Sequence, residues 1–224
     1  MLLPTEAPVM TLSSSTLFPQ GMLPLFIFEP RYRMMLAESL ATHRTFVVAL
    51  RKPGQTRETP CTVAGLGLIR ACVQYKDGTS HLVLQGLARV ALGKVSRYKP
   101  FRVQRIEPIP TFISEKTRIT SLASKVVDIV AKPNQYGWEI PLHLVMAPEP
   151  KGKSNSTPVS FDHILQHLRR IQDPCQLADI ISGALLDDVL ERQAILETAD
   201  LEERLTLLIK FLLAKVKARS KQKS

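Results

Sequence analysis

The spacing of the apolar residues changes near Pro110, and this change constrains the fold more than any other feature of the chain. Before it, short runs rich in Val, Ile and Leu end at Gly, Pro or polar residues, as β-strands do. After it, apolar residues recur at three- and four-residue spacing, as in amphipathic helices. The sequence therefore predicts an α+β protein with a strand-rich part, residues 1–110, followed by a helical bundle, residues 111–224.

The strand-rich part is expected to form an antiparallel sheet that curls into a barrel. Asp77-Gly78 separates two apolar runs, and Asp-Gly supplies the positive φ angles of a tight hairpin turn. Gly65, Gly67 and Gly86 lie inside strand patterns, where bulges that curl a sheet are a common reason for glycine. The expected strands are 23–28, 46–51, 62–75, 79–85, 87–98 and 102–109.

One short helix is expected within the strand-rich part. Pro30 fixes the backbone angle of a first helical turn, and three charged residues, Glu29, Arg31 and Arg33, flank this start. The residues that then recur at helical spacing are Tyr32, Met35, Leu36 and Leu40. The charges directly follow the apolar run 23–28, so they indicate either an acid–base site or a structural corner beside a recognition surface.

Helix start signals recur in the second half. Ser114 is a candidate cap for a helix that runs to about Ala131. Residues 132–158 then combine five prolines with Gly, Asn and Ser, which predicts a long loop. Further helices are expected to begin at Ser160, at Asp173-Pro174, at Asp187 or Asp188, and at Asp200, where Glu203 completes a capping box. The last helix leads into a basic tail, residues 215–224.

Composition narrows the class of protein. With 45% apolar residues the chain can bury a core, yet no apolar run is long enough to span a bilayer, so no membrane association is expected. The N-terminus lacks the basic and apolar regions of a secretory signal. Cys61, Cys72 and Cys175 have no metal-binding or redox spacing and suit a reducing compartment. We expect a cytoplasmic protein.

The net charge of +10 is unevenly distributed along the chain. Residues 1–110 hold 14 Lys and Arg against 6 Asp and Glu, residues 111–209 hold 10 against 14, and residues 210–224 hold 6 against none. Positive charge attracts nucleic acid or acidic proteins without requiring a particular sequence. However, the aromatic residues of the first half do not cluster as an RNA-stacking platform would.

No motif predicts catalysis, a cofactor or a metal. Gly152-Lys153-Ser154 lacks the earlier glycine of a phosphate-binding loop, since Ala147 stands at that position. His163 and His167 are one helical turn apart, but no Glu follows the first and no third ligand is near, so surface histidines are favoured. Glu29 is the only acidic residue of the strand-rich part that lies among apolar residues, and the adjacent arginines would keep it ionised. We expect a non-enzyme with neither metal nor cofactor.

A longer pattern gives a resemblance to a known family. The runs are LFPQGMLPLFIFEPRYRMML (17–36), TVAGLGLI (62–69), DGTSHLVLQGLARV (77–90), DPCQLADIISGALL (173–186) and ERQAILETADLEERLTLLIKFL (191–212). In this order they resemble the N-terminal substrate-binding domain of the ATP-dependent Lon proteases, peptidases of the S16 family. The match is similar to the free-standing bacterial proteins of this type, which lack the ATPase and the Ser-Lys protease modules.

The resemblance implies a PUA-like β-barrel followed by a helical bundle, in which Pro24, Pro30, Gly86 and Arg89 are structural motif residues. It also implies a recognition module that binds exposed apolar segments of unfolded or client proteins near residues 18–25 and the junction of barrel and bundle, with a separate protease or chaperone as a further partner. The predicted peptide-binding residues are Phe18, Met22, Leu23, Leu25, Glu29, Arg31, Tyr32 and Arg33.

Two other functions stay open on the sequence. The first is RNA binding by a basic barrel face, which charge reversal at Arg89, Arg97 or Arg105 would test because phosphate contacts make binding salt-dependent. The second is a small-molecule pocket in the mouth of the barrel, which a ligand-induced thermal shift would reveal. A proteolytic or ATPase activity of the chain would contradict the recognition hypothesis.

Overall fold

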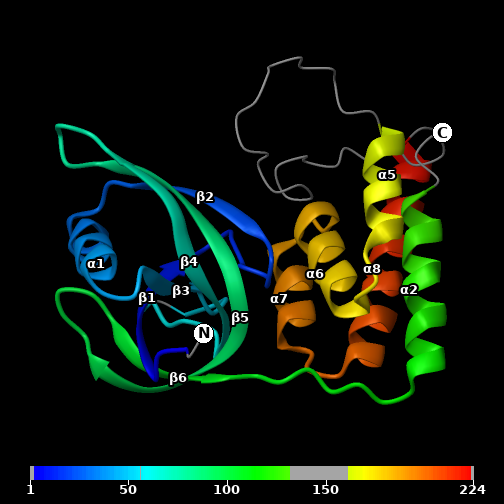
Figure 1. Ribbon diagram of the computed structural model, residues 1–224, viewed down its shortest axis with the longest axis horizontal. Helices are drawn as coiled ribbons and strands as arrows, with labels where there is room; N and C mark the ends of the chain where they lie inside the picture. Colours follow the sequence, from blue (N-terminus) through cyan, green and yellow to red (C-terminus); the bar gives the residue numbers. More distant parts are fainter. Residues whose placement is uncertain (1–2, 56, 132–160, 223–224) are drawn as a thin grey trace. The chain divides into compact units, whose positions relative to one another are not determined.

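The computed structural model describes residues 3–55, 57–131 and 161–222, and the chain divides into two compact units, Met1–Pro110 and Thr111–Ser224 (Figure 1). Unit 1 holds a six-stranded sheet and the helix α1. Its elements in chain order are β1 (Glu6–Leu12), β2 (Met22–Ile27), α1 (Pro30–Ala41), β3 (Thr45–Leu50), β4 (Val63–Gln74), β5 (Ser80–Arg97) and β6 (Val103–Pro108).

The sheet of unit 1 is mixed, which corrects the expectation of an antiparallel barrel. Its strand order is β2-β5-β4-β3-β1-β6, and β5 also pairs with β6, so five strands close into a ring and β2 lies outside it on β5. The strand β1, which was not predicted, pairs in parallel with β3, with Val9 opposite Val47. Parallel pairing requires a crossover, and β2 with α1 supplies it between the two strands.

The β4–β5 hairpin forms at Asp77-Gly78, as predicted. Gly78 has a φ of +82°, and the Asp77 carboxylate accepts hydrogen bonds from the backbone N–H and the hydroxyl of Thr79 at 2.9 and 2.8 Å. The two strands expected at 79–85 and 87–98 are one long strand, because β5 bends without breaking. Register shifts leave Leu87 of β5 and Arg70 of β4 without opposite residues, and such bulges bend a strand.

Two buried clusters fill unit 1, and alternate residues of β3 contribute to each. Phe46 and Val48 belong to the first cluster, to which α1 adds Tyr32, Met35 and Leu36. Val47 and Ala49 belong to the second, which also contains residues of β1, β4, β5 and β6. All six residues of β3 are buried, so this strand is covered on both faces. Burying a side chain of this size stabilises a fold by about 1.5–3 kcal/mol.

Glycines let the segment Leu17–Gly21 lie directly on the sheet. A Cβ atom at Gly65 would stand 2.0 Å from the Leu17 carbonyl oxygen, and one at Gly86 would stand 1.9 Å from that of Phe18. Gly86 also exchanges backbone hydrogen bonds with this segment, accepting from Gln20 N–H at 2.9 Å and donating to the Gly21 carbonyl at 2.8 Å. The bulge expected at Gly86 is found directly beside it, at Leu87, and the close approach of the backbone is a second reason for glycine at this position.

Unit 2 is helical among its described residues. Its helices are α2 (Lys116–Val130), α5 (Phe161–Arg170), α6 (Pro174–Leu185), α7 (Val189–Glu197) and α8 (Leu201–Gln222). Three predicted caps are confirmed, since Asp173, Asp188 and Asp200 accept hydrogen bonds from the backbone N–H groups of Cys175, Leu190 and Glu203 at 2.8–2.9 Å. Ser114 is not a cap, because α2 begins after Glu115 and the Ser114 hydroxyl contacts Glu202 at 3.2 Å.

A buried arginine joins α7 to α8 inside unit 2. The side chain of Arg204 is fully buried and donates to the carbonyl oxygens of Thr198 and Ala199 at 2.9 and 3.2 Å. It also lies 3.8 Å from the buried carboxylate of Asp179 on α6. Because a buried charge is costly unless it is paired, this cation fixes the turn between the two helices to α6.

Several sequence predictions fall outside the described residues. These are the loop at 132–158, the Gly152-Lys153-Ser154 motif, the helix start at Ser160, the side chains of His163 and His167, and the last two residues of the basic tail, 223 and 224. Among the helices that the structure describes, none has both the length and the apolar character needed to cross a membrane.

The close approach at Gly86 leads to a stability prediction. Gly86→Ala should lower the free energy of unfolding by about 2 kcal/mol or more, because overpacking against a backbone atom cannot be relieved by a rotamer change. Gly93→Ala is the matched control on the same strand, since its Cβ would meet nothing closer than 3.4 Å. Urea unfolding of both variants measures the difference, and equal midpoints would contradict this account of the Leu17–Gly21 segment.

Candidate functional site

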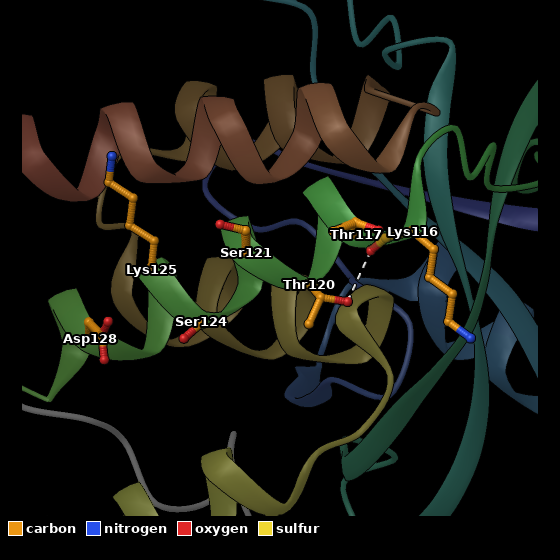
Figure 2. A pocket seen from close by; sticks show the side chains of 7 residues that line it. All are labelled: Lys116, Thr117, Thr120, Ser121, Ser124, Lys125 and Asp128. Carbon is orange, nitrogen blue, oxygen red and sulfur yellow. Dashed lines mark hydrogen bonds between the residues drawn. The ribbon is translucent and has the colours of Figure 1, made fainter.

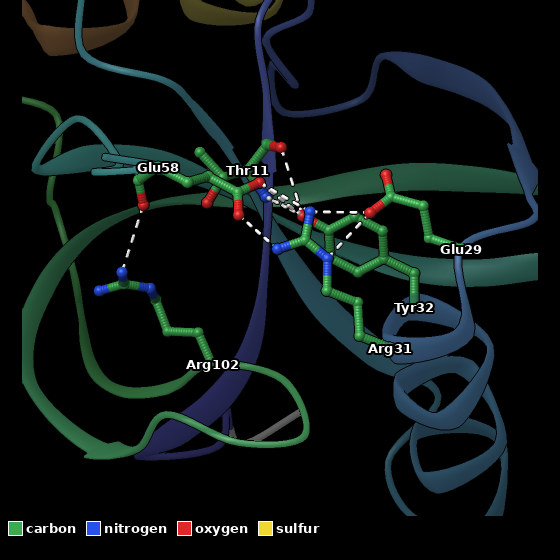
Figure 3. Close-up of polar contacts among 6 residues, drawn as sticks. All are labelled: Thr11, Glu29, Arg31, Tyr32, Glu58 and Arg102. Atoms are coloured by element: carbon green, nitrogen blue, oxygen red, sulfur yellow. Dashed lines mark hydrogen bonds and ion pairs between the residues drawn. The ribbon is translucent and has the colours of Figure 1, made fainter. Parts of the chain in front are cut away.

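Two of the three charges beside the apolar run, Glu29 and Arg31, form an ion-paired corner with Glu58 (Figure 3). Arg31 projects from the first turn of α1, where its Nε donates to Glu29 at 2.9 Å and its Nη2 donates to Glu58 at 3.0 Å. Its Nη1 forms a second hydrogen bond with Glu58, so the guanidinium binds that carboxylate with two nitrogens. Glu58 lies in the connection between β3 and β4, 27 residues further along the chain.

Tyr32 links this corner to β1. Its buried hydroxyl lies 3.1 Å from the Glu58 carboxylate and accepts a hydrogen bond from the Thr11 N–H at 3.3 Å. Burial is the main cause that raises the pKa of Tyr32 to about 12. Arg102 of unit 1 donates to the Glu58 carbonyl at 3.2 Å, so the connection that carries Glu58 is held from two sides.

The protonation states of the corner argue against acid–base chemistry. Burial alone would raise the pKa of Glu58, but hydrogen bonds and positive charge from Arg31 outweigh it and hold that pKa below its ordinary value. The hydrogen bonds that Arg31 donates to Glu58 in turn raise the pKa of Arg31. A general acid needs a raised carboxyl pKa, and here the shift is in the opposite direction. Of the two sequence hypotheses, the structural corner is therefore favoured.

An exposed apolar surface lies beside the corner, on the side of β2, β5 and β4 that faces away from the core. We call it the outer face. Cross-strand pairing places Phe26 opposite His81 and His81 opposite Val73, all three of them exposed. The same pairing places Pro24, Val83 and Ala71 in the next row. With Phe28 and Tyr75 at the ends of β2 and β4, the outer face comprises Pro24, Phe26, Phe28, Ala71, Val73, Tyr75, His81 and Val83.

Aromatic contacts organise this surface. The ring of His81 lies edge-on to Phe26 at 4.7 Å and to Tyr75 at 5.6 Å, and Phe26 stacks with Phe28 at 5.9 Å. Nevertheless Phe28 stays 59% exposed and Val73 58% exposed. Single exposed apolar residues are ordinary on a protein surface, whereas a contiguous group of them marks an interaction site.

Two hollows of about 410 Å³ each lie in unit 1, one on the outer face and one on the α1 side of the β4–β5 hairpin. The first is lined by residues of the outer face together with Leu25, Cys72 and Leu82. The second lies between α1 and the β4–β5 hairpin, where Met34, Leu40 and again Cys72 line it. Both are mostly apolar in their named residues, but only the first offers side-chain-sized space at the outer face.

The predicted peptide-binding residues fall into four groups in the structure. Phe18 and Tyr32 are buried, so neither side chain is available to a partner. Leu23 and Leu25 pack against the core from the inner side of β2. Met22 lies on the outward-facing side of β2, next to the outer face. The charged residues are Glu29 and Arg31, which pair with each other, and Arg33, which is exposed beside Gly78.

Sequence reasoning missed the residues that form most of the outer face. Phe26 and Phe28 alternate with buried Ile27, and Val73 and Tyr75 are likewise two positions apart at the end of β4. This alternation, combined with the Asp77-Gly78 hairpin, is the signal that would have placed them on one side of the sheet. The pairing of β2 with β5 has no comparable local signal, because it joins residues nearly 60 positions apart.

The arginines chosen to test RNA binding are placed unfavourably for that role. Arg89 is only 4% exposed, so its reversal would test folding rather than a surface. Arg97 pairs with Glu38 at 2.7 Å and stacks over the Phe101 ring, and Arg105 pairs with Glu6 at 3.6 Å. Because Arg89 is buried, it cannot form a basic surface together with Arg97 and Arg105, and the expectation of such a surface was wrong in this residue.

A larger hollow of about 760 Å³ lies along α2 in unit 2 (Figure 2). Among the described residues one helix alone lines it, with two Lys, one Asp and several Ser and Thr side chains. The hydroxyl of Thr120 donates to the Lys116 carbonyl within the helix at 2.9 Å. Because no opposing wall is present among these residues, the hollow encloses no ligand-sized space, and the outer face is the better candidate site.

No metal centre is found in the part of the chain that the structure describes, since no three His, Cys, Asp or Glu side chains gather there. The three cysteines are free thiols, of which Cys61 is buried. Burial also raises the pKa of the Cys175 thiol. A raised pKa disfavours the reactive thiolate, so this cysteine is not activated as a nucleophile.

Comparison with known families assigns the chain to a class. The model of the ATP-dependent protease La (LON) substrate-binding domain matches residues 6–214. This span includes both units nearly completely, so the chain belongs to the LON substrate-binding domain family, which confirms the resemblance seen in the sequence. The match is to this domain alone and includes no ATPase or protease module.

Individual relatives agree with this assignment. The chain is 21% identical to the Lon protease of Dictyoglomus thermophilum over 91% of its own length, and 25% identical to Lon protease 2 of Bdellovibrio bacteriovorus over 98%. It spans 24% and 26% of the lengths of these two relatives. Among solved structures, the N-terminal domain of the Mycobacterium avium complex Lon protease is similar with a TM-score of 0.67 at 18% identity, covering 92% of this chain and 97% of that one.

A second solved structure, the Lon N-terminal domain protein from Xanthomonas campestris, has a TM-score of 0.59 at 18% identity. It covers 93% of this chain and 99% of that chain. At such identities the likeness establishes the fold only. The observed architecture is thus that of a Lon N-terminal domain, with a mixed six-stranded sheet and a helical part.

The ion-paired corner leads to a pH prediction. Since the pKa of Glu58 is lowered in the folded protein, its ion pair stabilises the fold above the ordinary carboxyl pKa of about 4.5 and this contribution is lost as the pH falls through the folded value. Both side chains are partly exposed, so Glu58→Gln should cost only about 0.5–1 kcal/mol at pH 7.

Urea midpoints of the protein and of Glu58→Gln, measured at pH 7 and again near pH 3, test this prediction. We expect a difference at neutral pH that closes in acid. Glu107→Gln is the control, because Glu107 is an exposed carboxylate of the same unit. If the urea midpoints of the protein and of Glu58→Gln differ by the same amount at both pH values, ionisation of Glu58 does not stabilise the corner.

Proposed function

We propose that this chain is a recognition module that binds exposed apolar segments of unfolded or client proteins through the outer face. The observation that supports it is the contiguous apolar surface over three strands of a domain whose family is a substrate-binding one. Such a surface buries apolar area only when a partner covers it, and removing apolar area from water contributes about 25 cal/mol per Å².

The shape of the surface suits a range of sequences. Two phenylalanine rings, a tyrosine and a histidine offer large contacts with few rotatable bonds, which keeps the entropy cost of binding low. The hollow on the outer face offers space for one or two client side chains. A client segment needs apolar residues of approximate size and no fixed sequence, as expected for a module that selects unfolded chains.

The edge of β2 directs binding to side chains rather than to the backbone. The Gly86 N–H donates to the Gly21 carbonyl, and alternation from that pair leaves the backbone groups of Met22, Pro24 and Phe26 facing away from β5. Proline has no N–H to donate, so the outward edge lacks its central donor. Prolines at such positions weaken strand addition, which protects an open edge from indiscriminate pairing.

We also propose that the chain acts without catalysis, as a domain that presents clients to a separate protease or chaperone. The chain spans only about a quarter of the lengths of the Lon proteases that it resembles. The closed ring of five strands supports assigning unit 1 to the PUA-like barrels. ATP hydrolysis or proteolysis by the purified chain would contradict the non-catalytic part of this proposal.

RNA binding is the alternative, and it is supported by the excess of positive charge in residues 1–110. An exposed tyrosine, Tyr98, lies near Lys99 and under Arg102, a combination that RNA-binding surfaces use. The two functions differ in their response to salt. Phosphate contacts weaken steeply with salt, whereas apolar burial does not.

Mutation of the outer face tests the proposed function. The double variant Phe26→Ala and Phe28→Ala should weaken binding of a fluorescently labelled unfolded polypeptide by about 30-fold, since central aromatic residues contribute about 2 kcal/mol or more to an interface. Because both rings are at least half exposed, the free energy of unfolding should change little. Anisotropy titration measures the affinity, and urea unfolding checks the fold.

The matched control is Phe112→Ala, which removes an equally exposed phenylalanine from unit 2. It should leave binding unchanged. Unaltered affinity in the double variant, or an equal loss in the control, would mean that the outer face is not the binding site. Binding of a labelled structured RNA that falls with salt and survives both changes would instead favour the RNA alternative.

A further inference from the structure

Three exposed cations lie around the outer face, against two carboxylates, Glu29 and Asp77, of which Glu29 is paired with Arg31. Arg70 lies at the bulge of β4 beside Ala71, Lys76 lies in the hairpin turn beside Tyr75, and Arg33 lies against Gly78 of the same turn. All three residues are exposed. The one carboxylate in the turn is Asp77, which already accepts two hydrogen bonds from Thr79.

The remaining carboxylates of unit 1 are mostly engaged elsewhere. Glu29 and Glu58 bind Arg31, Glu38 binds Arg97, and Glu6 binds Arg105. The described ion pairs therefore take up most of the negative charge of unit 1 at sites away from the hairpin. Residues 1–110 contain 14 basic and 6 acidic residues, so an excess of positive charge remains on unit 1. Part of this charge lies at the rim of the outer face.

We propose that the outer face selects apolar segments that are flanked by acidic residues. This inference rests on the proposed function, to which it adds a class of client. The apolar core of the segment covers the outer face, and its flanking carboxylates lie within reach of Arg70, Lys76 and Arg33. Complementary charge at the rim of an interface raises the association rate and the specificity more than it raises affinity through any one contact.

The size of the preference follows from the exposure of these cations. One exposed ion pair changes affinity by about 1.4- to 5-fold, and several acting together should favour acidic over basic flanks by about tenfold at low salt. The Debye length falls from about 10 Å at 0.1 M salt to about 3 Å at 1 M. The preference should therefore shrink to about twofold or less at high salt, while binding of the apolar core persists.

Three labelled peptides with one shared apolar core provide the test, flanked by glutamates, by glutamines or by lysines. Their affinities are measured by anisotropy at 0.1 M and 1 M salt on the full chain. We expect the order glutamate, glutamine, lysine at low salt. Arg70→Glu with Lys76→Glu should abolish or invert this order and leave the glutamine-flanked peptide bound as before.

The control variant is Lys94→Glu with Lys99→Glu, which changes the net charge equally at the other end of β5 and in the turn that follows it, where both residues are exposed. It should keep the order of the peptides. Equal affinities for all three peptides, or the same loss of order in the control, would overturn the acidic-flank proposal alone. Failure of the protein to bind the glutamine-flanked peptide would instead overturn the proposed function itself.

Discussion

The contact between the Leu17–Gly21 segment and two glycines of the sheet determines where the candidate site forms. Because Gly65 and Gly86 have no side chain, the carbonyl groups of Leu17 and Phe18 reach the sheet, and Gly21 hydrogen-bonds to Gly86. That bond sets the register of β2 on β5, since the strand continues directly from it. A shift of one residue would turn Phe26 inward and Ile27 outward. The outer face thus depends on backbone contacts made outside it.

The apolar run and the charges that follow it have separate tasks. Residues of β2 alternate between the core and the outer face, so the strand contributes to stability with one side and to recognition with the other. Arg31 and Glu58 then hold the start of α1 against the connection between β3 and β4, and Tyr32 ties both to β1. An exposed ion pair alone contributes little, but here the guanidinium and the Tyr32 hydroxyl together orient three segments. The charges therefore hold the end of β2 in place without covering the phenylalanines.

Local patterns in the sequence predicted those features of the fold that depend on residues close together in the chain. The Asp77-Gly78 turn, the helix after Pro30 and the caps at Asp173, Asp188 and Asp200 each depend on contacts within a few positions. The parallel strand β1 was missed because it includes Pro8 and pairs with β3 about 38 positions away, which no local pattern encodes. Phe18 was expected at a surface because its neighbours form a loop, yet that loop packs on glycine and buries the ring. Glu58 gave no signal, since its partner Arg31 becomes adjacent only in the folded chain.

A surface with this much exposed apolar area invites self-association, and the same structural features that oppose it also shape recognition. Pro24 removes the central donor from the open edge of β2, so two copies cannot readily pair their strands. The cations around the hairpin repel the like-charged rim of another copy, whereas an acidic segment meets attraction at the same place. Charge reversal at Arg70 and Lys76 should therefore weaken acidic clients and also remove a barrier to self-association. Discrimination against copies of itself and preference for acidic flanks would then have one electrostatic cause.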